Sequence, residues 1–99
     1  MLSKSDAIEL VMKKLDEYPP LVDDQRVLLL DKTIEKPYGW IFFYNSKKAI
    51  ETGNVIYRLA GNGPVIVNKI AGSIEFFGSL PPIDVILDTY EKNLSHTQS

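Results

Sequence analysis

The stretch Trp40-Ile41-Phe42-Phe43-Tyr44 decides the fold, because each of its residues is aromatic or aliphatic. In an extended chain Trp40, Phe42 and Tyr44 share one face, and the two residues between them share the other. A strand that is apolar on both faces belongs at the centre of a sheet whose two faces are covered. The stretch therefore predicts a central strand, with Trp40 and Phe42 packed on the same side.

Two antiparallel hairpins are predicted around this strand. The segment 26–34, with its apolar run 27–30, leads through the turn Lys36-Pro37-Tyr38-Gly39 into the central strand. Farther along, the turn Gly61-Asn62-Gly63-Pro64 precedes a second apolar run, 65–67, and a loop around Gly72 leads to residues 74–77. The connection 45–60 is less regular: Glu51-Thr52-Gly53-Asn54 predicts a turn, and residues 55–59 fit a strand or a short helix.

An amphipathic helix is predicted at each end of the chain. Between Ser3 and Tyr18, apolar residues recur at helical spacing, and either Ser3 with Asp6 or Ser5 alone offers an N-cap. Pro19-Pro20 ends this helix. Pro81-Pro82 opens the second helix, whose apolar stripe consists of Ile83, Ile86, Leu87, Tyr90 and Leu94.

These elements predict one α+β domain over residues 1–99, with an antiparallel sheet of about four strands packed by the N- and C-terminal helices. The polar residues 95–99 are expected to form a frayed tail. A chain of 99 residues can bury one core, but not a core and a deep, shielded cavity as well. Its function is therefore expected on the surface.

Composition excludes several functional classes. The chain has no cysteine, which rules out disulfides, zinc ribbons and thiol nucleophiles. Its net charge of −2 offers no broad positive field for a nucleic acid. No signal-peptide pattern opens the chain and no apolar run is long enough to span a membrane, so we expect a cytoplasmic location and no membrane partner.

Residues for catalysis are scarce. The only histidine, His96, falls in the polar tail, so no Ser/His/Asp or Cys/His site can be assembled and no enzyme, cofactor or metal site is predicted. Carboxylates at Asp23-Asp24, or in a row on the second helix, could hold a hard cation or act as an acid/base pair, but neither group has the spacing of a calcium loop. The row, Asp84, Asp88 and Glu91, is interpreted as a solvated helix face, or alternatively as an acidic patch for a basic partner.

A protein-binding surface is predicted in the irregular connection, 47–62, together with Tyr44 and Tyr57. Loops carried by a rigid sheet concentrate binding residues, and tyrosine at the end of a strand offers a large contact at low entropic cost. Within this surface Glu51 and Tyr57 are the first candidates, and Asn62 is a further one. The full set of predicted partner-binding residues adds the acidic row of the second helix.

A series of short motifs runs along the chain: Gly39-Trp40-Ile41-Phe42, Glu51-Thr52-Gly53, the run 59–67, the turn at Gly72, and the segment from Pro82 through Tyr90-Glu91. In this order and spacing they resemble the YrhB-like proteins, the immunity protein 35 family. The resemblance implies a small α+β bacterial protein, often encoded beside polymorphic toxins and thought to protect the producing cell by binding the toxin. It supplies no catalytic residues. The matching positions, Trp40, Glu51, Gly53, Gly61, Asn62 and Pro64, can each serve the fold instead of contact.

The function expected from this resemblance is that of an immunity protein, which binds a cognate polymorphic toxin and neutralises it by stoichiometric occlusion. The partner is then a protein and the chain itself a monomer or weak homodimer. A general protein-binding or chaperone-like module with no toxin partner is the alternative.

Overall fold

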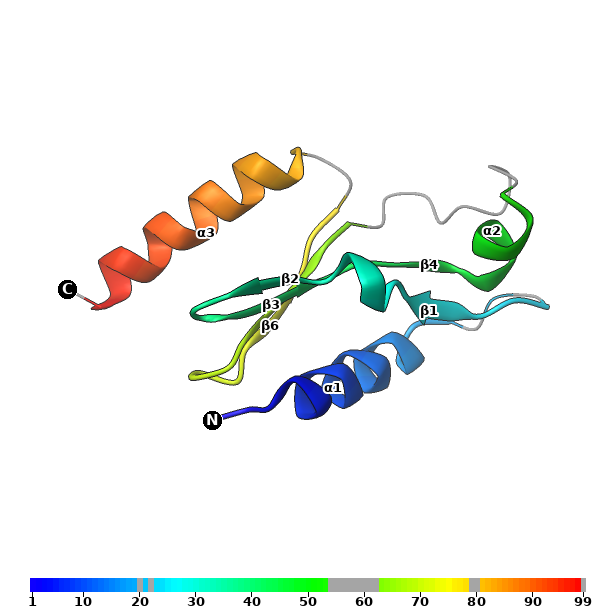
Figure 1. Ribbon diagram of the computed structural model, residues 1–99, viewed down its shortest axis with the longest axis horizontal. Coiled ribbons are helices and arrows are strands. Elements are labelled where there is room, and N and C mark those ends of the chain that lie inside the picture. Colours follow the sequence, from blue (N-terminus) through cyan, green and yellow to red (C-terminus); the bar gives the residue numbers. More distant parts are fainter. Residues whose placement is uncertain (20, 22, 54–62, 79–80, 99) are drawn as a thin grey trace.

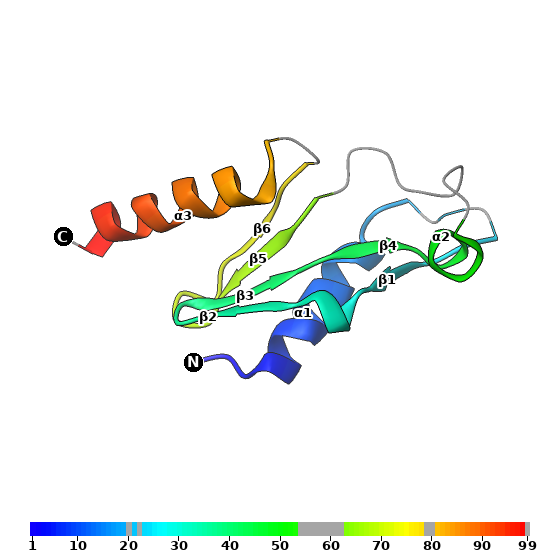
Figure 2. The ribbon, with the colours of Figure 1, turned by 45° about the horizontal axis from the view of Figure 1, so that its top comes forward.

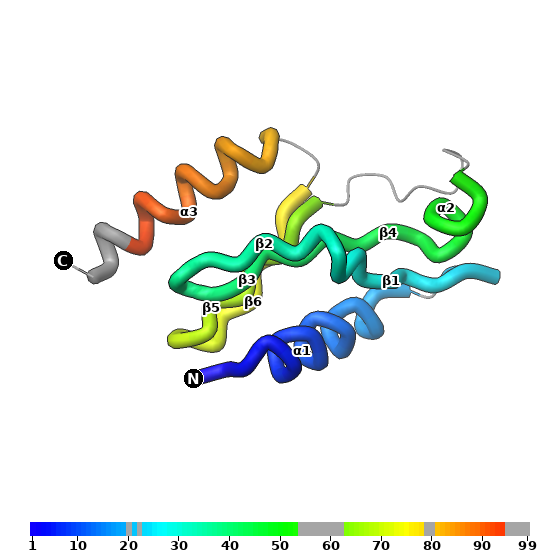
Figure 3. Tube along the Cα trace, in the orientation of Figure 1, coloured from blue at the N-terminus to red at the C-terminus, as the bar shows by residue number. Residues whose placement is uncertain are grey.

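The computed structural model describes residues 1–19, 21, 23–53, 63–78 and 81–98, with residues 95–98 described by their backbone only (Figure 3). The predicted α+β class, with a helix at each end, is confirmed. In chain order the elements are α1 (Lys4–Asp16), β1 (Arg26–Leu28), the 3₁₀ turn η1 (Leu30–Lys32), β2 (Ile34–Lys36), β3 (Gly39–Phe42), β4 (Tyr44–Ser46), α2 (Lys47–Thr52), β5 (Val65–Asn68), β6 (Ile74–Phe76) and α3 (Ile83–Gln98).

Four of these strands form an antiparallel sheet in the order β2-β3-β5-β6, and β1 pairs with β4 in a separate two-stranded sheet (Figure 1). Both predicted hairpins are present, because β2 pairs with β3 and β5 pairs with β6. The two hairpins join through β3 and β5, where Trp40 lies opposite Val67 and Ile41 opposite Ile66.

Helices cover both faces of the four-stranded sheet, with α1 on one side and α3 on the other (Figures 1 and 2). On the α1 side, Trp40 and Phe42 pack in a core cluster that includes Val11 of the helix. On the α3 side, Ile41 packs with Tyr90 in a second cluster. The prediction of a central strand with both faces covered is therefore confirmed, and so is the placement of Trp40 and Phe42 on one side.

The start of α1 follows the predicted signal. The Ser3 hydroxyl accepts a hydrogen bond from the Asp6 N–H at 3.1 Å, and the Ser3 N–H donates to the Asp6 carboxylate at 3.3 Å. This reciprocal pair is a capping box, which satisfies N–H groups that the helix itself leaves unpaired. The helix ends at Asp16, before the expected limit of Tyr18.

The prediction of one continuous strand over residues 26–34 is wrong. Five residues, 29–33, separate β1 from β2, whereas only Phe43 separates the opposing strands β3 and β4. Most of the surplus residues fold into η1, while the Leu29 N–H extends the β1–β4 ladder by one residue by donating to the Phe43 carbonyl at 2.8 Å. The interruption divides the long hairpin into two sheets that can turn relative to each other.

Two other boundaries differ from the prediction. Glu51 and Thr52 end the helix α2, and Gly53 follows as its C-cap in the left-handed region at φ 68°, so the expected turn is partly helical. The helix α3 continues to Gln98 and includes most of the residues expected to fray. The ambiguous stretch 55–59 and the turn residues Gly61 and Asn62 lie outside the described residues.

Candidate functional site

The helix α2 stands at the end of the molecule opposite α3, beside the connection that links α1 to β1 (Figures 1 and 2). It begins because the side chain of Ser46 accepts a hydrogen bond from the Ala49 N–H at 3.0 Å. Ser46 is fully buried, so this cap holds the helix to the sheet. We name the end of the molecule formed by α2 and residues 16–19, 21 and 23–25 the α2 surface.

Asp24 ties the two parts of the α2 surface together. Its Oδ1 accepts hydrogen bonds from the N–H groups of Lys48 at 3.0 Å and Gln25 at 2.8 Å. Desolvation by itself raises the pKa of Asp24, but these backbone donors, with the Ser46 hydroxyl and the Lys48 charge, outweigh it and hold the pKa below its ordinary value. The carboxylate therefore stays charged and serves as an anchor for the first turn of α2.

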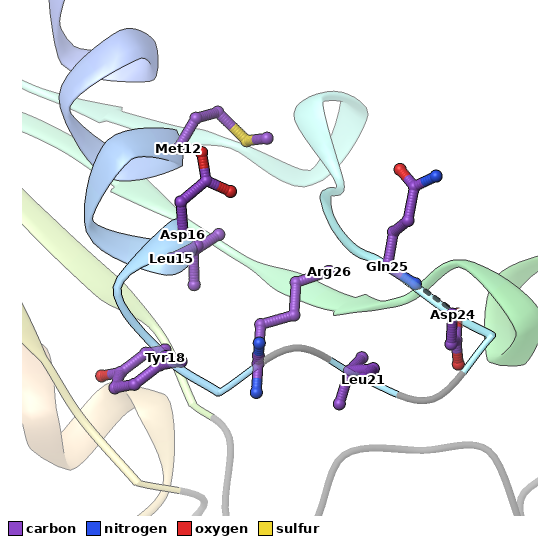
Figure 4. Close-up of a pocket in the computed structure, with 8 residues that line it drawn as sticks. All are labelled: Met12, Leu15, Asp16, Tyr18, Leu21, Asp24, Gln25 and Arg26. Carbon is purple, nitrogen blue, oxygen red and sulfur yellow. Dashed lines mark hydrogen bonds between the residues drawn. The ribbon is translucent and has the colours of Figure 1, made fainter.

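Arg26, the first residue of β1, contacts two residues that follow α1. Its guanidinium group donates a hydrogen bond of 2.9 Å to the Pro19 carbonyl and lies 5.3 Å from the centre of the Tyr18 ring. Figure 4 shows the Arg26 side chain between Tyr18 and Leu21. The cation–π contact and the hydrogen bond tie Tyr18 and Pro19, just after α1, to the first residue of β1.

Two open hollows of about 450 Å³ and 500 Å³ adjoin on the α2 surface and share Leu21, Asp24 and Gln25. The first is also lined by Met12, Leu15, Asp16, Tyr18 and Arg26. The second is also lined by Asp23, Lys47, Lys48 and Glu51. Carboxylates and ammonium groups thus stand side by side around an open, shallow floor, which suits contact with a polar protein surface better than enclosure of a small molecule.

Glu51, which the sequence analysis proposes as a contact residue, lies on the α2 surface. It is exposed, lines the second hollow, and its carboxylate is 3.9 Å from the Lys47 ammonium group one helical turn away. Exposed pairs of this kind contribute little to stability, so both charges are available to a partner.

Tyr44 does not lie at the surface, contrary to the prediction that it contacts a partner. Its side chain is 8% exposed and packs in the α1-side cluster with Trp40 and Phe42. Its ring also meets the Phe76 ring edge-on at 6.2 Å. The alternation of β4 places Tyr44 on the same inner face as Phe42, so this tyrosine supports the sheet.

The acidic row of α3 divides into two kinds of residue. Asp84 and Asp88 are exposed as predicted, and Asp88 pairs with Lys92 at 3.0 Å on the same helix. Glu91 is half-buried instead, because it accepts a 2.8 Å hydrogen bond from the Tyr38 hydroxyl and lies 3.4 Å from the Lys36 ammonium group. The prediction that all three project into solvent is wrong for Glu91.

The structure does not bring all the predicted contact residues together. Glu51 belongs to the α2 surface, whereas the acidic row belongs to α3, which lies in the other half of the molecule (Figure 1). Tyr57 and Asn62 lie outside the described residues, as does the side chain of His96. The anchoring role of Asp24 was not predicted, because its partner Lys48 is 24 residues away in the chain.

Among the described residues, no three histidine, cysteine, aspartate or glutamate side chains gather in a group that could hold a metal ion. No helix in the same part of the chain is long and apolar enough to cross a bilayer.

Comparisons with known proteins agree with the resemblance. A protein of Escherichia coli K12 named "Uncharacterized protein YrhB" is 40% identical over 53 residues, which make up 54% of this chain and 56% of that protein. The match therefore spans little more than half of the length of either chain. None of the solved structures matches. The family model described as "Immunity protein 35" matches residues 5–93, from the second residue of α1 into the last turns of α3. The chain therefore belongs to the immunity protein 35 family.

Proposed function

We propose that this protein is a bacterial immunity protein that binds a cognate toxin and neutralises it by stoichiometric occlusion, without turnover. The observation that carries the proposal is the match of the immunity protein 35 model over residues 5–93. That match spans both helical layers and the sheet between them, so it concerns the whole framework and not one shared motif.

The α2 surface is the proposed place of contact. Three contacts hold this surface in place: the cap at the buried Ser46, the Asp24 anchor, and the Arg26 contact with Tyr18. A surface that is ordered before binding loses less conformational entropy in the complex. Tyr57 and Asn62 remain proposed contacts by their place in the chain, next to α2.

Occlusion requires a contact of ordinary size, on the order of 800 Å² on each partner. The two adjoining hollows and the exposed face of α2 offer a continuous area with charges of both signs. Charges at the rim of such a contact mainly set the rate of association and the choice of partner. Asp84 and Asp88 provide a second, separate group of exposed charges for the same purpose.

The test is a titration of the purified toxin, taken as the product of the gene adjacent to that of this protein, while its toxic activity is followed. Protection is expected to saturate at a fixed molar ratio. Glu51→Lys, which reverses a charge on the α2 surface, is expected to weaken protection. The matched control Glu9→Lys reverses an exposed charge on α1 and is expected to have no effect.

A His96→Ala variant separates binding from catalysis, because His96 is the only histidine of the chain. Full protection by this variant, with the same equivalence point, agrees with stoichiometric binding. Inactivation of the toxin by substoichiometric amounts of the protein, or loss of protection in the variant, would contradict the proposal. Binding to unrelated unfolded proteins without preference for the toxin would support a chaperone-like module instead.

A further inference from the structure

The strand β6 is an edge of the four-stranded sheet, and its outer backbone groups have no bonding partner among the described residues. The Asn68 N–H donates to the Ser73 carbonyl at 2.9 Å, which sets the phase of the ladder between β5 and β6. Because bonded and non-bonded pairs alternate in an antiparallel ladder, Ile74 and Phe76 direct their N–H and C=O groups away from β5. These groups are a template for a further strand.

A groove of about 230 Å³ runs beside this edge, between β6 and α3. Figure 2 shows that α3 begins near the end of β6 and diverges from it toward the C-terminus. The groove is lined by Glu75, Phe77, Pro81, Ile86, Thr89, Tyr90 and Asn93. Glu75 is exposed, and no ion pair is formed by its carboxylate within the part of the chain that the structure describes.

We propose that β6 accepts an extended segment of the cognate toxin as an additional strand, with a lysine or arginine opposite Glu75 and an apolar residue on each side of it. This inference deepens the proposed function and rests on it. Main-chain hydrogen bonds to Ile74 and Phe76 would supply general affinity, and the side chains of the added strand would supply selectivity.

The charge requirement follows from the geometry of the edge. Residues directly opposite each other on neighbouring strands point to the same face, so the residue opposite Glu75 shares the face that carries the groove. The two residues that flank it point to the α1 side, next to the partly buried side chains of Ile74 and Phe76. An apolar, basic, apolar order in the added strand fits both faces.

A second copy of this chain fits the edge poorly in the register that is centred on Glu75. Two β6 strands paired antiparallel through their outer groups would place Ile74 opposite Phe76 and Glu75 opposite Glu75. Two like charges directly opposite each other destabilise a strand pair. In this register a basic residue opposite Glu75 is therefore favoured over a second copy of β6.

The other edge of the sheet, β2, differs from β6 in the charges beside its central glutamate. Its central residue Glu35 is already paired with Lys4 of α1 at 3.3 Å, and its last residue Lys36 lies 3.4 Å from Glu91 of α3. Both ion pairs tether β2 to a neighbouring helix. The two edges have the same length and the same central glutamate, so β2 offers a matched control.

The experiment compares amide hydrogen exchange by NMR in the free protein and in its complex with the product of the adjacent gene. The amides of Ile74 and Phe76 are expected to exchange at least about tenfold more slowly in the complex, because they become bonded. Glu75→Lys is expected to weaken the complex about tenfold, whereas Glu35→Lys is expected to change it less than about twofold. Thermal unfolding of both variants checks that they fold as the unaltered protein does.

The outcomes separate this inference from the proposed function. An equimolar complex in which the amides of Ile74 and Phe76 still exchange freely overturns strand addition and leaves immunity by binding intact. Equal weakening by the two charge reversals also overturns it, because a general electrostatic attraction would then explain both. Slow exchange of these amides in the free protein, together with a dimer in sedimentation, assigns the edge to self-pairing. Absence of any complex with the toxin overturns both proposals.

Discussion

The Tyr38 hydroxyl donates a hydrogen bond of 2.8 Å to the Glu91 carboxylate and so joins the β2–β3 turn to α3 across 53 residues of sequence. The Tyr38 ring also lies 5.3 Å from the ring of Tyr90, one residue before Glu91. Tyr90 in turn accepts a hydrogen bond from the Asn68 side chain at 3.4 Å. This group of contacts holds the middle of α3 against the turn of the sheet, next to its apolar contact with Ile41.

Replacing Glu91 is therefore expected to loosen α3, whereas replacing Asp84 on the same helix is not. Glu91→Lys removes the acceptor of the Tyr38 hydroxyl and places a second ammonium group near Lys36, so a loss of about 1–3 kcal/mol in the free energy of unfolding is expected. Asp84→Lys alters only an exposed carboxylate in the first turn and is expected to cost less than about 1 kcal/mol, mostly through the helix dipole. Urea denaturation of both variants measures the difference, and equal losses would contradict the special role of Glu91.

The ionisation of Tyr38 is expected at unusually high pH. Desolvation first, and then the hydrogen bond and charge of Glu91, raise the pKa of the phenol above its ordinary value of 10.0. A raised pKa means that the folded state keeps its proton longer, so this contribution to stability is complete below pH 10 and is lost as the pH rises toward the folded pKa. Titration by ultraviolet absorbance should show a late phenol that Tyr38→Phe removes. If the phenol that Tyr38→Phe removes titrates at an ordinary pH instead, the desolvated, Glu91-bonded environment of Tyr38 is excluded.

Asp24→Ala is expected to detach the first turn of α2. The variant lacks the acceptor for the Lys48 and Gln25 N–H groups, so the Lys48 amide should exchange faster, and binding of the toxin should weaken if the α2 surface is the contact. Since the pKa of Asp24 is lowered in the folded state, the same loosening should follow acidification below its ordinary value of 3.8, where the anchor becomes protonated. Asp16→Ala, an exposed carboxylate at the same hollow, is the control, and equal exchange of Lys48 in both variants would refute the anchor.

Gly39→Ala is expected to be far more damaging than Gly72→Ala. A Cβ at residue 39, where φ is +155°, would clash with the Val67 carbonyl oxygen, so the strands β3 and β5 could not keep their spacing. A loss of roughly 3–5 kcal/mol is expected. Gly72 has φ +74°, and an added Cβ would meet no other atom within 4 Å. Gly72→Ala therefore costs only the strain of a left-handed backbone at alanine, about 1–2 kcal/mol. Thermal midpoints of the two variants provide the comparison, and similar midpoints would contradict the close approach at residue 39.

Trp40→Ala is expected to cost about 3–5 kcal/mol, because the side chain is only 9% exposed and fills the α1-side cluster. This is a large share of the stability of a small domain, commonly 5–15 kcal/mol, so the variant should be partly unfolded at moderate temperature. Leu30→Ala, at a side chain that is 49% exposed, is the control and should cost less than about 1 kcal/mol. A folded Trp40→Ala variant with an unaltered thermal midpoint would instead indicate a binding role for Trp40.

The sequence by itself determined the elements whose signals are local. The capping box at Ser3 depends on a residue three positions away, the apolar stripe of α3 on spacings of three and four, and the two-sided character of β3 on alternation within five residues. Each of these features is carried by neighbours in the chain, and so each could be predicted. The arrangement of helix, sheet and helix in three layers could also be predicted, because a strand that is apolar on both faces requires a cover on each face.

Only the tertiary structure decided which side chains serve the fold and which remain for a partner. Tyr44 and Glu91 were both predicted as contacts, yet one packs beneath the sheet and the other is bonded to a tyrosine 53 residues away. The strand 26–34 is interrupted because five residues, 29–33, lie opposite the single residue Phe43. The Asp24 anchor depends on Lys48 of α2, 24 residues later in the chain. These features arise from pairs of residues that are distant in the chain, and such pairs are set by the packing of whole elements, which no local pattern encodes.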